Sequence, residues 1–130
     1  MLIPPVSRYM TSTPRIVTSH DTLSTARELM MAHSIHHLPV VDDGQLVGIV
    51  SDNDLERTRS YDEHVSDAMT CNVTRVDEAA PLDEAVTLMN AGRLGSLVVT
   101  GKAGITGIFT VTDAMRAFAE ILQRNNEGER

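Results

Sequence analysis

The sequence predicts a mixed α/β chain built from two similar units, each with the element order β-α-β-β-α, packed sheet against sheet. The main observation is an internal repeat: at an offset of 59 residues, positions 6–60 fall on 65–119 with 16 identities in 55 positions. The second is apolar spacing that changes within each repeat from helical to short β-rich runs. The third is composition, 42% hydrophobic but 3% aromatic, which suits thin aliphatic layers between small sheets. We therefore expect one unit at 1–63, another at 64–124, and a polar tail at 125–130.

The elements of each unit are expected in the same order. An extended segment leads into a helix with apolar residues at helical spacing, and two strands joined by a turn follow. A second helix then begins after a hydroxyl residue. The expected segments are 15–18, 23–30, 38–41, 46–50 and a helix from Ser51 in the first unit, and 74–77, 82–89, 97–99, 105–109 and a helix from Thr110 in the second.

Local signals predict where the first helix of each unit begins and ends. Asp21 is expected to cap the helix at 23–30, since short polar side chains accept the free N–H groups of a first turn. Pro81 is expected at the first helical position of its counterpart, where a missing N–H costs nothing. Gly92 is expected to end that second helix.

Composition and charge exclude several classes of function. The formal net charge is -7 and there is one cysteine, Cys71, which cannot form an intramolecular disulfide. The first residues lack the pattern of a signal peptide, and no apolar run approaches the length of a membrane span. We therefore expect a cytoplasmic protein. An acidic chain repels nucleic acid and anionic lipid, so neither is an expected partner.

The turn from the second strand to the second helix carries polar identities. Gly48 and Asp54 recur as Gly107 and Asp113, with a hydroxyl residue between them in both copies. One interpretation is helix capping alone. The other is a nucleotide site, in which the helix start meets phosphate, the carboxylate accepts from two ribose hydroxyls, and the glycine lets a flat ring approach the backbone. Spacing leaves both open.

The repeated motifs resemble a family. The glycine-to-aspartate turn, the Met-Thr pairs at Met10 and Met69, and the Leu-Pro-Val-Val run at 38–41 are similar to those of tandem cystathionine β-synthase (CBS) domains, over residues 6–122. The resemblance implies two clefts between the units and dimerisation. It also implies a non-catalytic role, without an obligatory cofactor, in which AMP, ADP, ATP or S-adenosylmethionine binds and an unidentified partner protein is regulated.

The resemblance also assigns the ligand-binding residues. Aspartates would hold ribose, and hydroxyl and neighbouring polar residues would meet ribose or phosphate. Early strands would contact the base, and residues just before the strands at 38–41 and 97–99 would line the clefts. The second copy of the motif matches better, so Asp113 marks the preferred site. The assigned residues are Arg15, Ile16, Val17, Ile35, His36, His37, Pro39, Ser51, Asn53 and Asp54 in the first unit, and Thr74, Arg75, Val76, Leu94, Gly95, Ser96, Thr110, Thr112 and Asp113 in the second.

The same sequence supports other functions less well than ligand binding. His33, His36 and His37 suggest a metal site, but no cysteine or carboxylate stands at ligand spacing and the second unit lacks all three. His36 is therefore expected to contact phosphate. No nucleophile and base stand at a recognisable spacing, so catalysis is not expected. The alternative to a ligand sensor is a dimerisation or docking module with empty clefts. Homodimerisation is expected through the apolar helix faces, including Ala114, Phe118 and Leu122.

Overall fold

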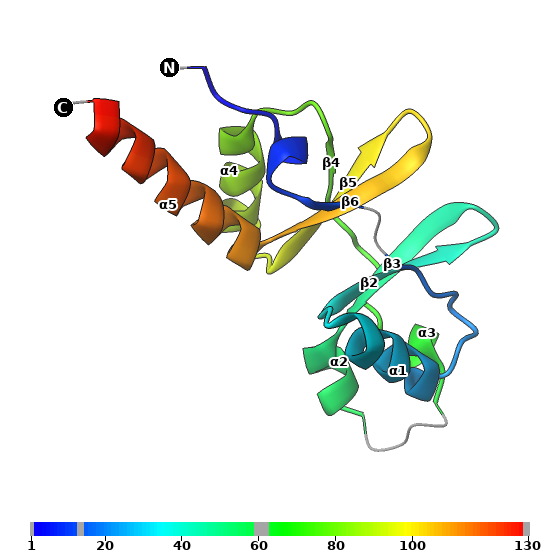
Figure 1. The fold of residues 1–130 in the computed structure, drawn as a ribbon. Helices are drawn as coiled ribbons and strands as arrows, with labels where there is room; N and C mark the ends of the chain where they lie inside the picture. Colours follow the sequence, from blue (N-terminus) through cyan, green and yellow to red (C-terminus); the bar gives the residue numbers. More distant parts are fainter. Residues whose placement is uncertain (1, 13–14, 59–62, 129–130) are drawn as a thin grey trace. The chain divides into compact units, whose positions relative to one another are not determined.

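The structure is a computed structural model that describes residues 2–12, 15–58 and 63–128. The chain divides into two compact units, and Figure 1 labels their elements. The central unit is Pro14–Val73, and the terminal unit combines Met1–Thr13 with Thr74–Arg130. These units are α+β in composition and repeat one another, as the sequence predicts. Within the described ranges, no helix is long and apolar enough to cross a membrane.

The terminal unit holds a four-stranded sheet of order β1-β6-β5-β4. β4 runs parallel to β5, and β5 and β6 form an antiparallel hairpin that also pairs with β1. In Figure 1 the N-terminal segment passes beside β4 and α4. The elements of this unit are η1 (Val6–Arg8), β1 (Thr11–Ser12), β4 (Arg75–Asp77), α4 (Leu82–Gly92), β5 (Ser96–Gly101), β6 (Gly104–Thr110) and α5 (Val111–Gly128).

The central unit has the same plan with shorter pairings at its edges. Its hairpin is flanked by two single bridges, Val17 to Val40 and Ile49 to Thr70. These bridges stand where β4 and β1 pair in the terminal unit, so the expected extended segment at 15–18 forms one bridge rather than a strand. The elements of this unit are α1 (Leu23–His33), β2 (His37–Asp42), β3 (Gln45–Ser51), α2 (Asp52–Glu56) and α3 (Val65–Ala68).

Each unit has its own hydrophobic core. Val6 and Tyr9 lie in the terminal core, against residues from α4, β5 and β6. Val65, the repeat of Val6, lies in the central core with residues of α1 and β2. The segments at 1–13 and 64–73 thus lie in the opposite units from those that the sequence division at 63 and 64 assigns.

Several helix boundaries differ from the sequence expectation. Thr22, not Asp21, caps α1, because its hydroxyl accepts from the Thr25 N–H at 3.2 Å while Asp21 accepts from the Thr18 N–H at 2.8 Å. Pro81 is the N-cap of α4 rather than its first residue. Gly92 is the last residue of α4, as expected. The polar residues from 125 remain helical as far as Gly128.

Candidate functional site

The predicted site residues of the terminal unit meet at one edge of its sheet. β4 and β5 are parallel and β6 is antiparallel to β5, so two strand beginnings and one strand end lie together. Ser96 pairs with Thr110 across the hairpin. The Val98 N–H donates to the Thr74 oxygen at 3.1 Å. This edge therefore gathers the segments 74–76, 94–96 and 110–113.

The central unit repeats this arrangement. His37 pairs with Ser51 across its hairpin, and the Asp52 N–H donates to the His36 oxygen at 3.0 Å. The Val17 N–H donates to the Pro39 oxygen at 3.1 Å. The segments 15–17, 35–39 and 51–54 thus also lie at one edge.

Asp54 and Asp113 both cap the helix in which they lie. The Ser51 N–H donates to Asp54 Oδ2 at 2.8 Å, and the Asp54 N–H donates to Ser51 Oγ at 3.2 Å. In the other unit Asp113 Oδ2 accepts from Thr110 N–H at 2.9 Å and Oγ1–H at 3.1 Å, and the Asp113 N–H donates to Thr110 Oγ1 at 3.3 Å. The capping interpretation is therefore confirmed, while a ligand role for the same carboxylates stays a prediction.

The two aspartates differ in how much of the carboxylate remains available to a ligand. Asp113 is 3% exposed, and its Oδ1 accepts from Arg116 Nη2 at 3.4 Å. Asp54 is only half-buried, and within the described part of the chain its Oδ1 has no hydrogen-bond partner. Arg57, the repeat of Arg116, also makes no side-chain hydrogen bond or ion pair to any described residue. Among the described residues, the central unit thus has a carboxylate oxygen and a neighbouring guanidinium that are both without a partner.

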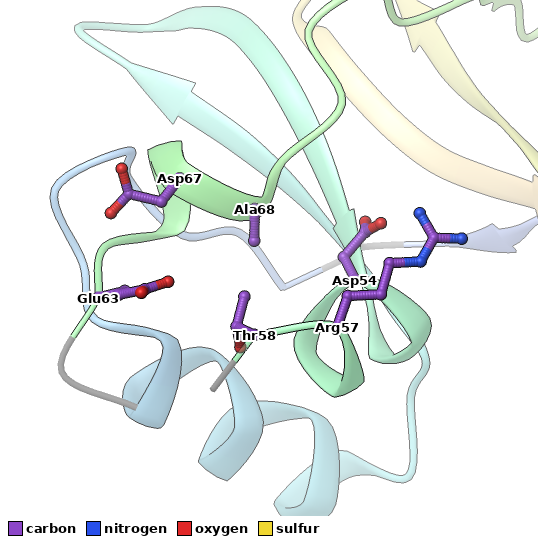
Figure 2. Close-up of a pocket in the computed structure, with 6 residues that line it drawn as sticks. All are labelled: Asp54, Arg57, Thr58, Glu63, Asp67 and Ala68. Atoms are coloured by element: carbon purple, nitrogen blue, oxygen red, sulfur yellow. The ribbon is translucent and has the colours of Figure 1, made fainter. Parts of the chain in front are cut away.

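A cavity of about 440 Å³ opens beside Asp54 in the central unit. Figure 2 shows Asp54 on α2 and Arg57 at the C-terminal end of that helix, with Glu63 on the other side of Thr58. The volume lies within the range of small-molecule sites. Sequence reasoning missed most of this lining, and the repeated arginine at Arg57 and Arg116 was its one signal. The lining residues are Asp54, Arg57, Thr58, Glu63, Asp67 and Ala68.

In the cluster of His33, His36 and His37, the His36 ring contacts a carboxylate. His36 Nδ1 lies 2.7 Å from Asp52 Oδ2, and the His36 side chain is 71% exposed. A carboxylate of its own unit thus already holds the ring expected to contact phosphate. Among the described residues, no group of three or more His, Cys, Asp or Glu side chains is placed to hold a metal ion.

The other predicted residues fall into three classes by burial. Val17, Pro39 and Val76 are buried, so their main chains rather than their side chains could reach a ligand. Ile35, His37, Thr74, Leu94 and Ser96 are half-buried. The exposed residues are Arg15, Ile16, Asn53, Arg75, Gly95 and Thr112.

The repeated glycines, Gly48 and Gly107, each lie against another segment of the same chain. A Cβ on Gly107 would lie 2.7 Å from the Thr11 oxygen and 2.6 Å from Met10 Sδ. A Cβ on Gly48 would lie 2.9 Å from the Thr70 oxygen. The repeated Met-Thr pair therefore occupies the space that the sequence interpretation gave to a ligand ring.

Comparison with known proteins identifies the family. The CBS domain family model matches residues 6–60 and 65–120, so the chain belongs to the CBS domain family, as two domains in tandem. Over 115 residues it is 32% identical to inosine-5′-monophosphate dehydrogenase of Thermoplasma acidophilum. That match covers 87% of this chain but only 24% of the enzyme.

Solved structures of CBS pairs share the fold. One pair, crystallised in complex with 5′-methylthioadenosine and S-adenosyl-L-methionine, has a TM-score of 0.84 and 27% identity, covering 92% of this chain and 98% of its own. The CBS-pair protein CBSX2 of Arabidopsis thaliana, crystallised in complex with AMP, has a TM-score of 0.77 and 28% identity. It covers 91% of this chain and 98% of its own. The fold is thus that of proteins whose structures contain adenosine-based ligands.

Proposed function

We propose that this chain is a non-catalytic regulatory module, which binds an adenosine-containing ligand and modulates a separate partner protein. One observation carries the proposal: in each unit, the same sheet edge gathers a carboxylate, a hydroxyl, the beginning of a hairpin strand and the extended segment that pairs beside it. The AMP and S-adenosylmethionine bound by structurally similar CBS pairs support this choice of ligand class. Cytoplasmic placement stays a prediction.

The carboxylates are proposed to bind ribose. A ribose presents two adjacent hydroxyl donors, and an ionised carboxylate accepts without donating. Asp54 Oδ1 is free of other partners among the described residues. Asp113 Oδ1 must first give up Arg116, whose contact at 3.4 Å is long for a hydrogen bond. Ribose binding therefore disturbs fewer contacts at Asp54, although the sequence favours the motif of Asp113.

A thermal-shift series tests the proposal. AMP, ADP, ATP and S-adenosylmethionine are each added in increasing concentration to the full chain. A ligand that binds only the folded state stabilises it by about 2.7 kcal/mol at a hundredfold excess over its Kd. The proposal fails if none of these compounds raises the melting temperature.

Variants locate the binding. Asp54→Asn and Asp113→Asn keep the shape of the side chain and a cap acceptor, so each is expected to fold and to weaken binding at its own unit about tenfold. Thr112→Ala removes an exposed hydroxyl that makes no hydrogen bond to another described residue. It tests the terminal unit without touching the cap. Asp83→Asn, an exposed aspartate in the first turn of α4, is the matched control and should leave binding unchanged.

A docking module without nucleotide is the second candidate. The observation that favours it is the apolar face of α5, where Met115, Phe118 and Leu122 are more than half exposed. Exposed apolar side chains grouped on one helix face are typical of protein contacts. Binding of a second copy, with no thermal shift by any adenosine compound, would favour this function over the sensor.

A further inference from the structure

One hairpin position differs between the two units at the edge where the site segments gather. It is Pro39 in β2 of the central unit and Val98 in β5 of the terminal unit. The Val98 N–H donates to the main-chain oxygen of Thr74 at 3.1 Å. Arg15 is the repeat of Thr74. Because proline has no N–H, Pro39 cannot donate the equivalent hydrogen bond to the Arg15 oxygen.

The missing N–H lies on the side of β2 that faces the segment 15–17. A strand residue directs its N–H and its oxygen to the same neighbouring segment. The Pro39 oxygen accepts from the Val17 N–H at 3.1 Å, so the Pro39 nitrogen also faces this segment. On its other side β2 pairs with β3 from His37 to Asp42. The proline therefore removes a hydrogen bond to the segment 15–17 and none to β3.

The pairing of the two extended segments differs accordingly. In the terminal unit β4 pairs with β5 over the three residues Arg75–Asp77. In the central unit the equivalent segment forms the single bridge from Val17 to Val40. No described residue donates to the Arg15 oxygen, and Arg15 is exposed. Water or a ligand can therefore provide the donor that this oxygen lacks.

The same edge of the central unit has a second open acceptor. Asp54 Oδ1 has no hydrogen-bond partner among the described residues. In the terminal unit both equivalent oxygens are engaged: the Thr74 oxygen accepts from Val98, and Asp113 Oδ1 accepts from Arg116 at 3.4 Å. A ligand with two donor groups thus meets two open acceptors in the central unit, and has to compete with protein donors in the terminal unit.

We infer that Pro39 determines which unit binds the ligand, because it leaves the Arg15 oxygen open to a donor on the ligand ring. This inference rests on the proposed function, which places the ribose at a carboxylate and the base at an early strand. Adenine has a suitable donor in its exocyclic amino group. The central unit is then the preferred site, with the amino group at Arg15 and the ribose hydroxyls at Asp54, although the repeated motif favours Asp113.

Calorimetric titration of the full chain tests the inference with two probes. One is AMP, and the other is purine riboside 5′-monophosphate, which has a hydrogen in place of the amino group. Loss of one hydrogen bond to the ligand is expected to weaken binding, so AMP should bind about fivefold more tightly than the second probe. Equal affinities for the two probes overturn the inference.

Variants at Pro39 assign this preference to the missing N–H. Pro39→Val introduces the residue of the terminal unit and restores the N–H, so the preference for AMP should fall to about twofold or less. The affinity for purine riboside 5′-monophosphate should stay the same. Pro39→Ala restores the same N–H with a smaller side chain, in case valine disturbs this buried position. Pro5→Ala, which replaces an exposed proline of the terminal unit, is the control and should keep the preference.

Two results with these variants would overturn the inference. One is a preference for AMP that survives in both Pro39 variants. The other is an equal weakening of both probes, because that would show that Pro39 acts only through the structure of the unit.

The aspartate variants identify the unit and separate this inference from the proposed function. Asp54→Asn should weaken AMP binding about tenfold, and Asp113→Asn by about twofold at most. The reverse order overturns the inference and leaves the proposed function standing. Absence of AMP binding also overturns the inference, and the proposed function fails with it only if no adenosine compound raises the melting temperature.

Discussion

Arg116 donates from Nη2 to the main-chain oxygen of Tyr9 at 2.7 Å, joining residues 107 positions apart in the sequence. The same nitrogen lies 3.4 Å from Asp113 Oδ1, so one guanidinium connects the N-terminal segment to the first turns of α5. Tyr9 in turn packs in the core of the terminal unit. Arg116 thus anchors a segment that precedes the rest of its unit by about half the chain.

Arg116→Ala is the first prediction. Loss of a charge-assisted hydrogen bond to a main-chain oxygen is expected to lower the free energy of unfolding by about 1–2 kcal/mol. Arg57→Ala is the matched control, because the repeated arginine makes no such contact with any described residue and should change stability by less than about 0.5 kcal/mol. Urea unfolding measures both. Equal losses in the two variants would contradict the anchoring role.

Gly107→Ala is the second prediction. The new Cβ would lie 2.7 Å from the Thr11 oxygen, which belongs to the strand paired with β6. Because backbone must shift to admit the methyl group, we expect a loss of about 1–3 kcal/mol. Gly95→Ala is the control, since no described atom beyond its chain neighbours lies within 4 Å of its Cβ position. Thermal unfolding of the two variants measures the difference. If Gly107→Ala melts at the same temperature as the wild type, the close approach of the Thr11 oxygen does not restrict the side chain at position 107.

The repeat predicted most of the fold. Aligned apolar residues such as Leu23 and Leu82 are buried at the start of equivalent helices, and the predicted hairpins form in both units. The exchange of N-terminal segments could not be predicted. Val6 and Val65 are identical residues in equivalent segments, so the sequence pattern does not distinguish which core each one enters.

The candidate site was only partly predictable. The capping pairs at Ser51 and Thr110 follow from local spacing, because a cap and its carboxylate are three residues apart. The cavity depends on Ala68 and Glu63 approaching α2 from a separate segment. Only the structure shows that Ala68 leaves open the place that Tyr9 fills.

The third prediction concerns the pH dependence of the central unit. The Ser19 Oγ–H donates to Asp42 Oδ2 at 2.5 Å and the Ser19 N–H donates to Oδ1 at 2.9 Å. The hydroxyl first, and then the N–H, lower the pKa of Asp42 below its ordinary value of 3.8. Since the folded state favours the ionised form, this stabilisation is present above that value and is lost as pH falls through the lowered pKa.

Asp42→Asn tests this dependence. The variant is expected to be less stable than the wild type at neutral pH, and the difference should shrink as pH falls below 3.8. Urea midpoints of both proteins across the acid range measure it. Ser19→Ala should reproduce the effect from the donor side. A difference that stays constant through the acid range would show that ionisation of Asp42 does not contribute.

The last prediction concerns self-association through α5. Phe118 is 57% exposed and Leu122 is 51% exposed, and both lie on a helix whose Ala117 is buried against the terminal core. Covering such side chains with a second copy removes apolar surface from water, which favours a dimer. Phe118→Glu with Leu122→Ser places a charge and a hydroxyl in that contact, so the dimer should dissociate at least tenfold more readily. Met31→Glu is the control, since Met31 is 73% exposed on α1 of the central unit and should not change the mass. Light scattering over a concentration series gives the mass of each protein, and a monomeric wild type at every concentration would rule out this contact.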